Sequence, residues 1–107
     1  MLKLYISQPM RGKTQEEILR VREKAIASAK RNCGEDVEVE VIDSYIPDYN
    51  PDKGCVALKF LSKSIEMLAD ADVAYFAKGW EEARGCKIEH ECAIAYGIDV
   101  IEDYTED

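Results

Sequence analysis

Stretches typical of β-strands alternate with stretches typical of α-helices along the whole chain, and this alternation restricts the fold most strongly. Strand-like runs occupy residues 2–7, 37–42, 72–79 and 98–103, and helical spacing of apolar side chains recurs between them. This order predicts a three-layer α/β domain, in which helices cover both faces of a mostly parallel sheet of four to five strands, as in flavodoxin or Rossmann folds. The first strand is expected to be central.

The helices are predicted from their apolar periodicity and their end signals. Thr14 followed by Glu17 is a capping-box signature for the start of the first helix, and Gly34 suits its end. The second helix is expected within residues 55–71 and the third within 86–97, closed by Gly97. Residues 79–85 fit either a loop or a helix start. The proline-rich residues 44–54 indicate a loop.

Length and charge limit the classes of protein to which the chain can belong. Its 107 residues predict one domain spanning residues 1–107. The net charge of -8 argues against general binding to nucleic acid or to anionic membranes, but it leaves room for a small anionic ligand held by local cations. Because the N-terminus lacks a signal-peptide pattern and no apolar run approaches the ~20 residues of a membrane span, we expect a cytoplasmic protein.

The four cysteines are expected to be reduced thiols. Cys33, Cys55, Cys86 and Cys92 include no C-x-x-C pair and accompany no secretion signal, so no disulfide is predicted. Cys86 and His90 stand four residues apart and would share a helical face, as some metal ligands do. Because no second pair of ligands is evident, neither a metal nor another cofactor is expected.

Four of the basic residues follow predicted strands. Arg11 and Lys13 come after the first strand, and Lys78 and Arg84 come after the third. In open α/β sheets a ligand lies beyond the carboxyl ends of the strands, so these cations predict an anion site there. The other interpretation is that these loops are simply polar and charged.

The last helix carries an acidic residue at the edge of its apolar side. At about 100° per residue, Ile88, Cys92, Ala95 and Tyr96 would form the inward arc, with Lys87, His90 and Glu91 pointing away. Glu89 falls at the edge of that arc, where it would face the crevice at the sheet edge. A partly buried glutamate in such a place can act as a nucleophile or general base. Alternatively, it forms a surface ion pair with Arg84 or Lys87.

Two segments together resemble the nucleoside 2-deoxyribosyltransferase superfamily. YISQPMRG (residues 5–12) is similar to its first-strand motif, Y-[IL]-[AS]-G-P. Residues 69–101 resemble its later half, in which an aspartate precedes an apolar strand, G-x-x-x-E follows, and a glycine precedes the last strand. The signatures PMRG, GWE and EHE are most similar to a branch found in bacteria and phages. The resemblance implies that residues 1–107 form one domain of this type.

The resemblance also implies roles for individual residues. In the family, the glutamate of G-x-x-x-E attacks the anomeric carbon and forms a glycosyl-enzyme intermediate, and Glu89 and Gly85 match this motif. The first-strand tyrosine that lines the active site matches Tyr5. The loop that contacts sugar or phosphate corresponds to Gln8, Met10, Arg11 and Gly12. Lys78, Gly79 and Trp80, which follow the third strand, complete the expected substrate-binding residues. The family needs no metal.

Three positions depart from the family pattern. Gln8 replaces the usual glycine, and Ser64 stands where the family has a base-orienting aspartate. The aspartate just upstream of the glutamate is also missing, although Glu81 and Glu82 lie close by. Glycosyl transfer to a carboxylate needs one group to attack and another to help the base leave. Glu89 fits the first role, and no single residue clearly fits the second.

Two functions therefore remain open. The first is cleavage or transfer of the N-glycosidic bond of a nucleoside or nucleotide, and the alternative is a nucleotide-binding module without catalysis. Arg11 and Lys13 favour a phosphorylated substrate, because a neutral nucleoside offers such cations little to bind. The apolar Ile94 on the outer helix face, and the family's use of a neighbouring subunit in the active site, favour a homodimer or higher homo-oligomer. A small structural or regulatory subunit of a phage or mobile element is a third interpretation.

Overall fold

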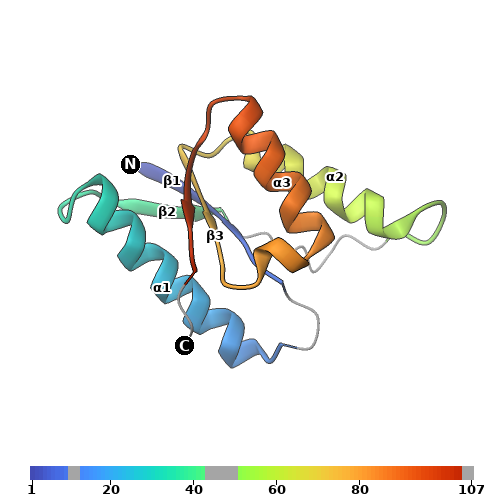
Figure 1. Ribbon diagram of the computed structural model, residues 1–107, viewed down its shortest axis with the longest axis horizontal. Coiled ribbons are helices and arrows are strands. Elements are labelled where there is room, and N and C mark those ends of the chain that lie inside the picture. Colours follow the sequence, from blue (N-terminus) through green and yellow to red (C-terminus); the bar gives the residue numbers. More distant parts are fainter. Residues whose placement is uncertain (10–12, 43–50, 105–107) are drawn as a thin grey trace.

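Four parallel strands form one sheet at the centre of the molecule (Figure 1). Across the sheet their order is β2 (Val39–Ile42), β1 (Leu2–Ser7), β3 (Val73–Phe76) and β4 (Asp99–Glu102), and every neighbouring pair is parallel. The computed structural model describes residues 1–9, 13–42 and 51–104. The predicted α/β fold is confirmed, and β1 is a central strand as expected.

Helices cover both faces of this sheet. They are α1 (Gln15–Cys33), α2 (Val56–Leu68) and α3 (Arg84–Ala95), with a short 3-10 helix, η1 (Trp80–Glu82), before α3. Figure 1 shows α1 on one face and α2 with α3 on the other, which gives the three layers of a flavodoxin-like fold. Within the described ranges, no helix has both the length and the apolar character required to cross a membrane.

The start of α1 uses the expected capping box. The hydroxyl of Thr14 accepts a hydrogen bond from the Glu17 N–H at 3.1 Å, and the Glu17 carboxylate accepts one from the Thr14 N–H at 3.4 Å. Two otherwise unpaired N–H groups are thereby satisfied. Gly34 closes the helix with φ at 128°, a conformation that strongly favours glycine. Local sequence alone therefore fixes both ends of α1.

Successive side chains of the central strands point to opposite faces of the sheet, so the core has two layers. Leu4 and Ile6 on β1 face α1, whereas Tyr5 faces α2 and α3. The α1 layer is completed by Ala25, Ala29, Val73, Tyr75 and Ala77. The opposite layer is completed by Leu68, Ala74, Phe76, Trp80, Cys86 and Ala93. Because all four residues of β3 are buried, its apolar run agrees with the expectation of a strand covered on both faces.

Several element boundaries differ from the prediction. β2 begins at Val39 because Val37 remains in a turn, where its N–H donates to the Gly34 carbonyl at 3.2 Å. β3 ends at Phe76, and the chain then turns through Gly79 into η1. α3 begins at Arg84, two residues before the expected start, so Gly85 belongs to its first turn. Residues 79–85, which fitted either a loop or a helix start, are therefore divided between η1 and α3.

The predicted inward arc of α3 is wrong at Ala95, Tyr96 and His90, whereas Cys92 packs against the core and Lys87 and Glu91 are exposed as expected. Tyr96 is 85% exposed and Ala95 is also exposed, whereas the side chain of His90, expected to point outward, is 18% exposed. The buried positions of the helix are Cys86, Glu89 and Ala93. Small side chains at 86 and 93 allow α3 to approach the sheet closely, and this packing sets the rotation of the helix. Glu89 consequently lies at the centre of the buried face.

The carboxyl ends of β1 and β3 form the point where the strand order reverses. From β1 the chain passes to β2 on one side, and β3 then pairs with β1 on the other side. Ser7 is opposite Phe76 in the register, and the Ala77 N–H donates to the Ser7 carbonyl at 2.9 Å. Ligands of open α/β sheets bind outside such a switch point. This edge is therefore the first place to look for a site.

Candidate functional site

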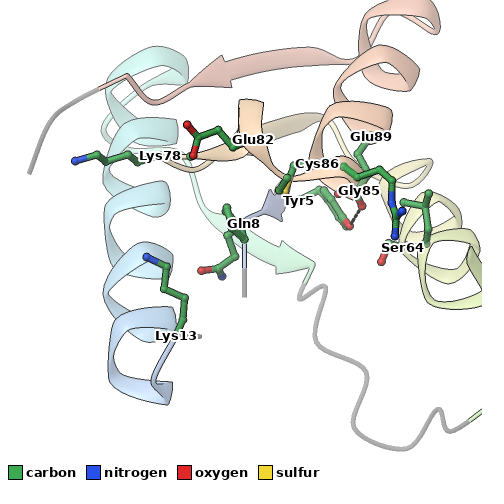
Figure 2. Close-up of a pocket in the computed structure, with 14 residues that line it drawn as sticks. Tyr5, Gln8, Lys13, Ser64, Lys78, Glu82, Gly85, Cys86 and Glu89 are labelled. Carbon is green, nitrogen blue, oxygen red and sulfur yellow. Dashed lines mark hydrogen bonds between the residues drawn. The ribbon is translucent and has the colours of Figure 1, made fainter. Parts of the chain in front are cut away.

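A cavity of about 790 Å³ opens at this switch point, on the side of the sheet covered by α2 and α3 (Figure 2). We call it the first cavity. It is lined by Tyr5, Gln8 and Pro9 from β1 and the turn after it, by Leu61 and Ser64 from α2, and by Lys78 and Gly79 after β3. Glu82 of η1, Ala83, and Gly85, Cys86 and Glu89 of α3 complete this side. Tyr5, Gln8, Lys78, Gly79, Gly85 and Glu89, all predicted from sequence, are thus brought together.

Glu89 is buried and held by two hydroxyl groups. The residue is 5% exposed, one carboxylate oxygen accepts a hydrogen bond from the Tyr5 hydroxyl, and the other accepts one from Ser7 Oγ at 2.7 Å. The hypothesis of a surface ion pair with Arg84 or Lys87 is therefore wrong. The expectation that Glu89 faces a crevice at the sheet edge agrees with this geometry, in which Tyr5 lies beside the carboxylate (Figure 2).

Burial controls the protonation of this pair. It raises the pKa of Glu89, although the hydrogen bonds from Tyr5 and Ser7 oppose this effect by stabilising the carboxylate. The pKa of Tyr5 is also raised, first by burial and then by the adjacent Glu89 charge. Tyr5 therefore retains its proton as a donor, and Glu89 is the member of the pair that can ionise. A desolvated carboxylate of raised pKa is a better base and nucleophile than an exposed one.

Ser7 is a functional candidate that the sequence patterns did not single out. Because successive side chains of a strand point to opposite faces, Tyr5 and Ser7 necessarily face the same layer. Once Tyr5 is assigned to a site, this period of two is the signal that could have found Ser7. The residue is 1% exposed, and its hydroxyl approaches Glu89 from the end of β1.

Cations gather at the first cavity. Lys13, Lys78 and Arg84 all contribute to its lining. Lys13 lies 4.0 Å from a carboxylate oxygen of Glu17, whereas Lys78 and Arg84 make no ion pair with any residue that the structure describes. Met10, Arg11 and Gly12, predicted to bind sugar or phosphate, lie outside the described residues.

Trp80 has a different position from the one predicted. It is 8% exposed and does not contribute to the lining of the first cavity. Its ring stacks on His90, with centroids 4.2 Å apart and an interplanar angle of 19°, and it also contacts Phe76 at 5.7 Å between centroids. The tryptophan therefore supports the site from within the core, by fixing η1 against α3.

Among the residues that the structure describes, the first cavity contains one further acidic side chain. Glu82 lines it, whereas Glu81, the other candidate upstream of Glu89, does not. Ser64, which replaces the family's aspartate, also lines the cavity, and its hydroxyl donates to the Phe60 carbonyl at 3.1 Å. Burial raises the pKa of Cys86, so its thiol is neutral beside Glu89. Glu82 is thus the second ionisable carboxyl group available to a ligand here.

Cys86 and His90, the pair considered as metal ligands, face different partners. His90 Nε2 contacts the Glu102 carboxylate, whereas Cys86 lies beside Ser7 in the first cavity. Over residues 1–9, 13–42 and 51–104, no three His, Cys, Asp or Glu side chains come together as a metal site would require. All four cysteines are free thiols.

Comparison with known protein families matches residues 2–102 to the family described as "Domain of unknown function (DUF4406)". The chain belongs to this family. No curated protein matches the sequence. The DUF4406 match runs from β1 to the last residue of β4, so every described residue of the first cavity falls inside the family domain.

Proposed function

We propose that this DUF4406 protein cleaves or transfers the N-glycosidic bond of a nucleoside or nucleotide, with Glu89 as the nucleophile. The observation that carries the proposal is the Glu89 carboxylate, buried at the switch point and held by Tyr5 and Ser7 inside a cavity. A buried carboxylate is costly to maintain, so a cavity built around one favours chemistry over packing.

The resemblance to the nucleoside 2-deoxyribosyltransferase superfamily supports the choice of reaction. Glu89 and Gly85 stand at its G-x-x-x-E motif and Tyr5 at its first-strand tyrosine, and all three residues line the first cavity. These motifs are far apart in the sequence, yet the fold brings them to one edge of the sheet. This convergence supports a nucleoside or nucleotide as the ligand.

The reaction would proceed in two balanced steps. In the first, a Glu89 oxygen bonds to the anomeric carbon while the bond from that carbon to the base nitrogen breaks, and the base leaves with a proton. In the second, water or another base attacks the same carbon, passes a proton to the group that protonated the departing base, and releases Glu89 as a carboxylate. Tyr5 and Ser7 would orient the carboxylate before attack.

Glu82 is the best-placed group to assist the departing base. It is the second carboxyl group of the first cavity, and a carboxylic acid can donate the proton that the base nitrogen requires. This position would let η1 supply the acid while α3 supplies the nucleophile. The role that the sequence left without a clear residue is thereby assigned to Glu82.

The alternative is a binding module that holds a nucleotide without cleaving it. One observation favours it: both oxygens of Glu89 are already occupied by protein hydroxyl groups. Attack would require one oxygen to exchange its hydroxyl partner for the sugar carbon. A site that never makes this exchange would bind ligand and release no base.

The test is release of free base from pooled nucleosides and nucleotides, followed by chromatography. We expect the wild-type protein to release base and Glu89→Gln, which keeps the shape but loses the charge, to be at least about 100-fold slower. Glu91→Gln is the matched control, because Glu91 is exposed on the same helix and does not line the first cavity. Co-purified nucleotide without base release from the wild type would favour the binding module instead.

A further inference from the structure

A second cavity lies on the opposite face of the sheet, between its carboxyl edge and α1. Its volume is about 650 Å³, and it shares Gln8, Pro9, Lys13, Lys78 and Gly79 with the first cavity. These shared residues form a saddle between the two hollows, made by the turns after β1 and β3. In Figure 2, Gln8 is seen between the Tyr5–Glu89 pair and the two lysines of the saddle. One ligand can therefore contact both cavities across this saddle.

The second cavity is rich in cations. Among the described residues, Lys13, Arg20, Lys24 and Lys78 contribute to its lining, against two acids, Glu17 and Asp103. Three of these cations also have a carboxylate partner: Lys13 lies 4.0 Å from Glu17, Arg20 lies 3.2 Å from Glu16, and Lys24 lies 2.9 Å from Asp103. The whole chain has the opposite balance, with 14 basic and 22 acidic residues. The excess of basic side chains around the second cavity attracts anions locally, as it does in clefts lined by one sign of charge.

The floor of the second cavity is built from buried polar groups. Asp103 is 7% exposed and accepts hydrogen bonds from the Tyr75 hydroxyl at 2.8 Å and from Lys24 Nζ at 2.9 Å. This network ties Lys24 of α1 to the end of β4, so the cation is held in place rather than free to rotate. Because Asp103 offsets the charge of Lys24, the excess positive charge of the second cavity comes from Lys13, Arg20 and Lys78.

Lys78 is the cation at the centre of the arrangement. It lines both cavities, it is exposed, and it forms no ion pair with a carboxylate of the residues that the structure describes. In a nucleotide the 5′-phosphate is carried on the side of the sugar ring away from the anomeric carbon. With the anomeric carbon at Glu89, a phosphate crossing the saddle would pass Lys78 and reach the second cavity.

We propose that the second cavity is a phosphate subsite, and that the ligand is a nucleoside 5′-phosphate lying across the saddle with its sugar in the first cavity and its phosphate in the second. The identification of the sugar end rests on the proposed function, whereas the phosphate end rests on the charges of the second cavity alone. Lys78 contacts the phosphate at the saddle, and Arg20 contacts it within the second cavity.

Calorimetry at one fixed ionic strength tests this arrangement. The probes are a nucleoside, its 5′-monophosphate, its 5′-triphosphate and inorganic phosphate, each titrated into wild-type protein and three variants. We expect the 5′-phosphates to bind at least about tenfold more tightly than the nucleoside, and Lys78→Gln to remove most of that difference. Arg20→Gln removes a cation that lines the second cavity but not the first, together with its exposed pair to Glu16, and should weaken the triphosphate more than the nucleoside. Lys87→Gln is the matched control, because Lys87 is exposed and lines neither cavity.

Each result decides the inference separately from the catalytic proposal. Equal affinities for nucleoside and 5′-phosphate, or an unchanged triphosphate affinity in Arg20→Gln, would overturn the phosphate subsite even if the protein released base. Phosphate-dependent binding that is lost in Lys78→Gln and Arg20→Gln supports the subsite even if no base is released. Inorganic phosphate bound as tightly as the 5′-monophosphate would overturn the claim that one ligand spans both cavities.

Discussion

At the residue scale, Glu89 places a chargeable group in a buried position, where it is 5% exposed. The carboxylate is accepted there because both of its oxygens receive hydrogen bonds from neutral hydroxyl groups, Tyr5 and Ser7. Hydrogen bonds to a charged acceptor are roughly twice as strong as neutral ones, but they compensate only part of the desolvation. The desolvation that the hydrogen bonds leave uncompensated raises the pKa of Glu89.

The pH dependence of stability follows from the direction in which folding moves this pKa. A carboxyl group whose pKa is raised by folding stabilises the fold below its unfolded pKa of 4.5, and this contribution is lost as the pH rises through the folded pKa. We therefore expect Glu89→Gln, which cannot ionise, to gain stability relative to the wild type as the pH rises from 4 to 8. Because a tenfold change in proton affinity corresponds to about 1.4 kcal/mol, even a modest rise in the pKa gives a measurable difference.

Urea unfolding of both proteins across this pH range measures the effect. Glu91→Gln makes the same change on the exposed side of α3 and serves as the control. A difference between Glu89→Gln and the wild type that stayed constant from pH 4 to 8 would mean that folding does not perturb the Glu89 carboxyl group.

At the element scale, the link from β3 to α3 positions the site. Gly79 adopts a left-handed conformation with φ at 89°, which turns the chain into η1, and Gly85 lies in the first turn of α3. A Cβ added at either glycine would make only ordinary contacts, with Pro9 Cγ at 3.6 Å for Gly79 and Leu61 Cδ1 at 3.8 Å for Gly85. The two positions therefore differ in backbone conformation rather than in available space.

Alanine substitution should separate these two glycines. We expect Gly79→Ala to lower the free energy of unfolding by about 1–2 kcal/mol, because an L-residue is disfavoured in the left-handed region. Gly85→Ala should raise it by up to about 1 kcal/mol, because alanine is the better helix former. Thermal or urea unfolding compares them directly, and equal effects of the same sign would refute the backbone explanation.

At the scale of the whole molecule, the order of the strands in the sheet determines which strands lose their backbone hydrogen bonds last on unfolding. β1 and β3 have a parallel partner on each side and lie between helical layers. In the part of the chain that the structure describes, β2 and β4 are edge strands with partly buried side chains. We expect the amides of β1 and β3 to exchange with solvent most slowly, at rates set by global unfolding. Native-state hydrogen exchange tests this, and equal protection of β2 or β4 would argue against it.

The mode of assembly stays a prediction at this scale. A homodimer or higher homo-oligomer is expected partly from Ile94, which is 57% exposed on α3. Single exposed apolar residues are common on monomeric proteins, so this exposure does not decide the question. Sedimentation velocity at several protein concentrations would measure the oligomeric state directly.

The sequence by itself determined the order and type of the elements, because strand and helix periodicities and end signals act over a few residues. The Thr14 capping box, the Gly34 helix end and the buried apolar run of β3 could all be read in this way. It also placed Lys78 after the third strand and Glu89 on the last helix facing the crevice at the sheet edge, where the topology of an α/β sheet puts ligands.

Only the tertiary structure decided how α3 is rotated and what Glu89 contacts. The partners Tyr5 and Ser7 are 84 and 82 residues away in the chain, and no local pattern links them to Glu89. The apolar residues of α3 are scattered around the helix, so its buried face was set by the close approach of Cys86 and Ala93 to the sheet. The same long-range packing buries Trp80 in the core and leaves the second cavity beside α1. Such contacts depend on side chains that meet only after folding, which is why periodicity alone could not predict them.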